Sequence, residues 1–235
     1  IPIIYYSVFI VAALYVIGFG FSTYFLPEKL KPYVLFLTPW FTLVAITFVL
    51  TILSLAGISV RLATWVILPV SLLLTGYTVS KQEFAWSKTK WKSIAVLAFV
   101  FFGIVLHLMP LLRRDRMLTT ISLGNNDVIV YANTPDYLEH HSIFEGYKYL
   151  PADLKPNEKG AANLLHDGFR WGTPIMSSFL QVITGLKGYQ IAYMYQVILY
   201  ALLILLAYVL YIRLFKESWI ALFILGIAFI FNVNM

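Results

Sequence analysis

Long apolar blocks, separated by short polar stretches, make up most of this chain. Six blocks of about 15 to 25 residues contain no Lys, Arg, Asp or Glu. An apolar helix of about 20 residues is long enough to cross the roughly 30 Å hydrocarbon core of a bilayer. The pattern predicts an all-α polytopic membrane protein with about six transmembrane helices, at Ile3–Leu26, Tyr33–Gly57, Leu62–Ser80, Ser93–Leu112, Tyr189–Ile212 and Trp219–Val233.

The polar stretch from Lys81 to Lys92 contains four lysines and predicts the orientation of the spans. Because Lys and Arg are enriched in cytoplasmic loops, we expect this stretch to face the cytoplasm. One further crossing then places the loop 113–188 on the extracytoplasmic side. The chain is therefore predicted to be an integral protein of the plasma (inner) membrane.

A shorter apolar stretch runs from Trp171 to Leu186. Thr173 followed by Pro174 is typical of a helix start, with Thr173 as the N-cap and the proline in the first turn. The apolar positions share one face and two polar positions lie opposite: Ile175, Phe179, Val182 and Leu186 against Ser178 and Gln181. The pattern favours a short amphipathic helix at the membrane surface, which also lets the positive charges after the next span face the cytoplasm.

Composition agrees with this class of protein. The chain is 60% hydrophobic and 12% charged, with a mean hydropathy of +0.82. It has no cysteine, which excludes disulfides, and its net charge of +6 is scattered over loops, so no nucleic-acid partner is expected. Since the chain begins without Met and stops in an apolar run, we expect it to be part of a longer protein.

The loop after the fourth span concentrates the polar chemistry. Eight of the eleven acids and three of the four histidines lie between Arg113 and Arg170. A connection of this length is more often functional than a plain connector. Asn126 can cap a helix with Asp127 in its first turn, and Thr134 with Pro135 predicts a second helix start. By spacing alone, the acids of this loop fit helix-start charges as well as they fit catalysis.

Several features of this half of the chain resemble one membrane-enzyme family. The first two are a span with a basic end and Asp127 with an aromatic residue four positions later. The others are the stretch "FEGYKYL", predicted to be a helix that ends at its glycine, and the stretch "RWGTPIMSSFLQVITGLKGYQIAYMYQ". Together, over about residues 97–235, they resemble the GT-C superfamily, integral membrane glycosyltransferases that use polyprenyl-phosphate-linked sugars. The resemblance implies a module over 93–235, comprising span 93–112, outer loop 113–188 and two further spans, truncated at its C-terminus. Residues 1–92 then form an N-terminal extension of three spans and a basic cytoplasmic loop.

The resemblance also implies an activity and a site. Asp127 would be the general base of sugar transfer, and Tyr131 would stack on the sugar or orient the base. Arg113, Arg114 and Arg116 would bind the donor phosphate, although arginines flanking a span also bind ordinary lipid head groups. Further substrate contacts are predicted at Asp136, His140, His166, Asp167 and Arg170. Partners would be the lipid-linked donor, membrane lipids and a glycan, lipid or protein acceptor.

Other interpretations of the sequence stay open. The pairs Asp136–His140 and His141–Glu145 have the four-residue spacing of metal ligands and equally that of solvated helix pairs, so no cofactor is predicted and a divalent metal has weak support. A secondary transporter is the main rival function, although the spans lack buried acids. A noncatalytic membrane assembly subunit is the third.

Overall fold

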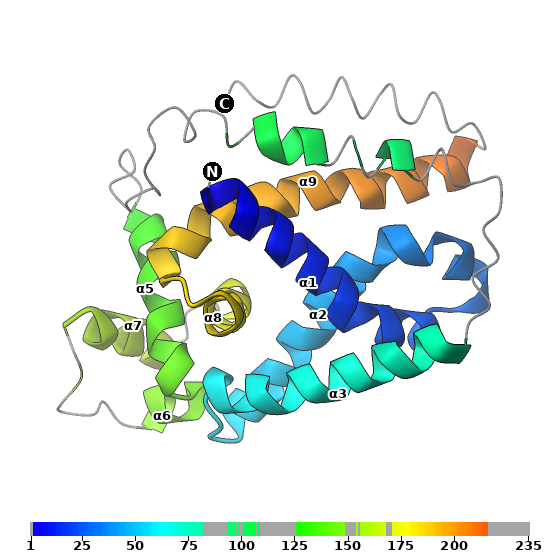
Figure 1. Ribbon diagram of the computed structural model, residues 1–235. Coiled ribbons are helices and arrows are strands. Elements are labelled where there is room, and N and C mark those ends of the chain that lie inside the picture. The colour runs from blue at the N-terminus through cyan, green and yellow to red at the C-terminus, as the bar shows by residue number, and fades with distance from the viewer. Residues whose placement is uncertain are drawn as a thin grey trace. The chain divides into compact units, whose positions relative to one another are not determined.

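The computed structural model describes residues 2–81, 94–96, 98, 101–106, 108, 126–148, 154, 156–167 and 171–215. Within these ranges every regular element is a helix and there is no strand (Figure 1). The predicted all-α class is therefore confirmed for the part of the chain described.

Four helices are long and apolar enough to cross a membrane. They are α1 (Pro2–Phe25), α2 (Val34–Leu55, preceded by the 3-10 helix Glu28–Tyr33), α3 (Val60–Lys81) and α9 (Gly188–Phe215). They match four of the six predicted spans. The described part of the fourth predicted span forms a shorter apolar helix, Ile94–Leu106, and the sixth, Trp219–Val233, lies outside the described residues. The number of six stays a prediction.

The chain divides into two compact units that do not follow chain order. The first comprises Ile1–Thr42, Leu73–Arg116 and Gln196–Met235, and the second comprises Leu43–Leu72 and Met117–Tyr195. This division describes packing within the structure. The predicted boundary between residues 92 and 93 describes a family module, and it stays a prediction.

Small and hydroxyl residues bring α1 and α2 together in the first unit. A Cβ at Gly18 would lie only 1.5 Å from the Thr42 Oγ1, so glycine alone fits this contact. Thr42 donates to the Leu14 carbonyl at 2.8 Å, and the hydroxyls of Ser22 and Thr38 are 2.7 Å apart. Such close approaches, with hydroxyls bonded across them, are how apolar helices associate in lipid.

In the second unit, α5 (Asn126–His140) lies between α7 (Pro156–His166) and α8 (Gly172–Thr184), as Figure 1 shows. The short α6 (Ile143–Lys148) packs on α7. The side chains of α8 are buried from Pro174 to Gln181, so α8 is the central element of this unit. The described part of the loop is thus a packed helical structure rather than a bare connector.

The structure corrects the predicted details of α8. The helix begins at Gly172 after Trp171, and no side chain caps it, so the prediction of Thr173 as N-cap is wrong. Pro174 lies in the first turn as predicted. Ser178 and Gln181 are 0% and 2% exposed, so the polar side of α8 faces other helices and not water. The reason is that Gln181 has a polar partner on α5.

Two predicted helix ends are also wrong. No helix starts at Thr134, because α5 continues through Pro135 to His140. A proline inside a helix costs about 3 kcal/mol, and here the packing of fully buried side chains such as Leu138 compensates for it. Likewise α6 does not end at Gly146 but continues to Lys148. A Cβ at Gly146 would lie 3.3 Å from the Leu165 Cβ, so this glycine allows α6 to approach α7.

Candidate functional site

Helix α5 carries most of the predicted site residues. The described part of α5 runs from Asn126 to His140, so Asp127 lies in its first described turn and Tyr131 lies one turn later, and the predicted cap at Asn126 stays a prediction. The structure describes the side chains of α5 from Tyr131 onward, and the Tyr131 side chain is half-buried. An acid in the first turn of a helix is stabilised by the positive end of the helix dipole.

Asp136 joins three helices. Its Oδ1 accepts hydrogen bonds from the side-chain amide of Gln181 on α8 and from the backbone N–H of Gly188 at 3.1 Å. Gly188 is the first residue of α9, so the Asp136 carboxylate occupies the positive end of that helix. These bonds assign Asp136 a structural role, and its part in substrate binding stays a prediction.

Gly188 makes the contact between α9 and α5 possible. A Cβ at this position would lie 2.0 Å from the Ala132 carbonyl oxygen, which is backbone and cannot move aside like a side chain. The start of α9 therefore rests directly on the backbone of α5. With the Asp136 bonds, this contact fixes the C-terminal half of α5 to α8 and α9.

The contact between α5 and α8 also contains unused hydrogen-bonding capacity. Thr134, Ser178 and Gln181 each bury an oxygen atom that has no hydrogen-bond partner among the described residues. Buried polar groups without partners are uncommon in proteins and cluster where a further group binds or where structure is strained.

A capping box lies at the start of α6, just after the C-terminal end of α5. The Ser142 N–H donates to the Glu145 Oε2 at 3.0 Å, and the Glu145 N–H donates to the Ser142 Oγ at 3.1 Å. The His141 Nδ1 lies 3.3 Å from the same carboxylate, and its ring stacks on Tyr137 with centroids 4.8 Å apart. The four-residue spacing of His141 and Glu145 therefore serves the start of α6. This box was not among the predicted features, although Ser142-x-x-Glu145 has the sequence pattern of a capping box.

Glu139 and Ser54 connect this corner to the turn between α2 and α3. The Arg61 guanidinium lies 3.9 Å from the Glu139 carboxylate, and the His140 Nε2 lies 3.8 Å from the same oxygen. The Ser54 Oγ accepts a hydrogen bond from the Ile143 N–H at 2.8 Å. No group of three His, Asp or Glu side chains in the described ranges is close enough to hold a metal ion.

The predicted site residues do not all meet at one place. Asp127 and Asp136 are nine residues apart on α5, which separates them by about 13 Å along the axis and places them on opposite sides. His166 ends α7 and Asp167 follows it, and both are exposed. The remaining predicted residues lie outside the described residues: Arg113, Arg114, Arg116 and Arg170.

Comparison with known proteins adds no family to this picture. No protein-family model matches the chain, and no curated protein or solved structure matches it.

Proposed function

We propose that this chain is a membrane glycosyltransferase that moves a sugar from a polyprenyl-phosphate donor to an acceptor at the extracytoplasmic face, with Asp127 as the general base. One observation carries the proposal. Asp127 lies near the beginning of α5, and nine residues later the Asp136 carboxylate bonds to Gln181 near the end of α8 and to Gly188 at the start of α9. A general base must be held in place relative to its substrate, and an anchored helix provides this.

The proposed reaction needs little more than this base. The acceptor hydroxyl oxygen attacks the anomeric carbon, the bond between that carbon and the phosphate oxygen breaks, and the hydroxyl proton passes to Asp127. The polyprenyl phosphate leaves as an anion and so requires no acid. A positioned carboxylate contributes about 10²- to 10⁴-fold to such a step.

The composition of the helices agrees with a donor that stays in the bilayer. The spans α1, α2, α3 and α9 are apolar, whereas the helices of the loop carry acids and histidines. A substrate with a long isoprenoid tail and a sugar phosphate head requires this combination. In the proposal, Arg113, Arg114 and Arg116 bind the phosphate through bidentate hydrogen bonds.

The test is sugar transfer in membranes that contain the protein and a radiolabelled polyprenyl-phosphate sugar. Asp127→Asn keeps the size of the side chain and removes the base, so we expect transfer to fall by about 10²-fold or more. Glu28→Gln is the matched control, because Glu28 is an exposed acid on the 3-10 helix and its loss should leave transfer unchanged. Full activity of Asp127→Asn would remove the proposed role of this residue.

A separate assay distinguishes the rival transporter. Vesicles that contain the protein but no lipid-linked donor should accumulate no radiolabelled sugar if the chain is a transferase. Uptake that depends on the protein would favour a secondary transporter and overturn the proposed reaction.

A further inference from the structure

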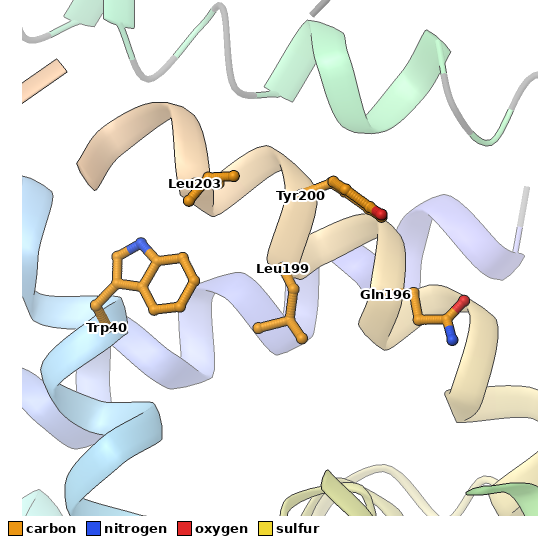
Figure 2. A pocket seen from close by; sticks show the side chains of 5 residues that line it. All are labelled: Trp40, Gln196, Leu199, Tyr200 and Leu203. Atoms are coloured by element: carbon orange, nitrogen blue, oxygen red, sulfur yellow. The ribbon is translucent and has the colours of Figure 1, made fainter. Parts of the chain in front are cut away.

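A groove lies between α2 and α9 in the first unit. It is lined by Trp40 from α2 and by Gln196, Leu199, Tyr200 and Leu203 from α9, and has a volume of about 410 Å³ (Figure 2). This size is within the roughly 300 to 1,000 Å³ of ordinary ligand sites. The four α9 residues have the spacing of a single helix stripe, about 10 Å long.

Contacts at three positions of α9 hold α2 and the residues before it against this helix. The Trp40 indole N–H donates to the Leu202 carbonyl at 2.8 Å, and nearer the C-terminus of α9 the rings of Phe36 and Tyr208 meet edge to face at 5.2 Å. The Arg213 guanidinium lies 5.5 Å from the Tyr33 ring and donates to the Lys29 carbonyl. The wall of the groove is therefore held by contacts along the C-terminal half of α9.

These contacts also show how deep the groove lies in a bilayer. Arg213 is an exposed charge and marks one boundary of the hydrocarbon. Gln196 is seventeen residues earlier in α9, about 26 Å away along the axis, and so lies just inside the opposite boundary of a roughly 30 Å core. Leu203 is about 10 Å deeper than Gln196. The groove thus runs from the level of the lipid ester groups toward the middle of the membrane.

The polarity of the lining follows the same direction. Gln196 is exposed, and its amide has no hydrogen-bond partner among the described residues, which is costly for an amide at this depth. The lining deeper in the membrane is aliphatic, with Leu199 and Leu203, or aromatic. A polar end at the boundary followed by an apolar channel matches the order of groups in a membrane lipid.

We infer that this groove binds one hydrocarbon chain of a membrane lipid, with a carbonyl or hydroxyl oxygen at the lipid's polar end bonded to the Gln196 amide. This binding does not depend on the proposed transferase activity. Acyl and isoprenoid lipids share the required chemistry, so the mass of the bound lipid distinguishes them.

Native mass spectrometry of the protein, purified in detergent from its membrane, tests this inference. We expect the wild-type chain to retain a lipid, and Leu199→Trp to lose most of it because the indole fills the groove. Leu210→Trp is the matched control, since Leu210 is 56% exposed on α9 and does not line the groove. Gln196→Leu should lower lipid occupancy by roughly two- to tenfold, the effect of one lost hydrogen bond.

Circular dichroism and size-exclusion elution identify any variant that fails to fold. If Leu199→Trp fails to fold, Gln196→Leu provides the test, because it replaces only one exposed side chain. Equal lipid retention by wild type, Leu199→Trp and Gln196→Leu would overturn the inference. So would a wild-type chain without bound lipid, or a dimer that Leu199→Trp dissociates, because the occupant would then be a second copy of the chain.

Discussion

Several single residues in this protein matter because they allow two helices to approach each other closely. Gly18 and Gly188 each permit an approach that a methyl group would prevent, and Gly146 lies at a contact where a methyl group would fit only tightly. The sequence predicts Gly146 only as a helix end and predicts no role for the other two, because a glycine's role depends on which backbone lies opposite it. Asp136 was predicted as a substrate contact, which stays a prediction, and its structural partners on α8 and α9 are 45 and 52 residues away in the chain, beyond the reach of any local pattern.

Gly188 gives a prediction at this scale. Gly188→Ala places a carbon 2.0 Å from the Ala132 carbonyl oxygen, so we expect it to lower the free energy of unfolding by about 1–3 kcal/mol or more. Gly160→Ala is the control, because a Cβ there meets nothing within 4 Å and a helical alanine should stabilise by up to about 1 kcal/mol. Denaturant titration in detergent measures both, and equal stabilities would contradict the contact between α5 and α9.

At the scale of elements, apolar patterning identified α1, α2, α3 and α9, because lipid requires the same uninterrupted apolar stretch that makes such helices visible in sequence. The helices of the loop were harder to predict. The Thr134–Pro135 pair has the local pattern of a helix start, yet α5 continues through it, since tertiary packing outweighs local preference. The same packing buries the polar side of α8, which its own sequence predicts to be exposed.

The start of α6 depends on the capping box, which one substitution can remove. Ser142→Ala takes away the oxygen that accepts the Glu145 N–H, and should cost about 0.5–2 kcal/mol. Hydrogen exchange is the direct measurement: the Glu145 amide should lose protection, whereas Ser80→Ala, an exposed serine at the end of α3, should leave it unchanged. Unchanged exchange at Glu145 in Ser142→Ala would show that the box does not hold α6.

At the scale of the whole molecule, α9 defines opposite sides of a membrane. Its 28 residues extend for about 42 Å, so Lys187 before it and Lys29, which contacts Arg213 at its other end, must face different compartments. With the loop 113–188 outside, as predicted, Lys187 faces the extracytoplasmic side and Lys29 faces the cytoplasm. Because this chain has no cysteine, a single introduced cysteine can report the side on which each residue lies.

We expect Lys187→Cys to react with an impermeant maleimide added to intact cells, and Lys29→Cys to react only after the membrane is opened. Leu205→Cys is the control, because Leu205 is 0% exposed and should react in neither case. The reverse pattern for the two lysines would invert the orientation and place Asp127 on the cytoplasmic side, where an extracytoplasmic acceptor is out of reach.

The arrangement of the two compact units has a consequence for how the protein is made. The second unit is nested within the chain and has all its residues once Tyr195 has been synthesised, whereas the first unit also needs segments from Gln196 onward. Since chains emerge from the ribosome N-terminus first and compact units fold as they are completed, the second unit can fold before the first unit is complete. During translation, α1 can thus pack on α2 as soon as α2 is made, but the unit that contains both is completed only after the second unit.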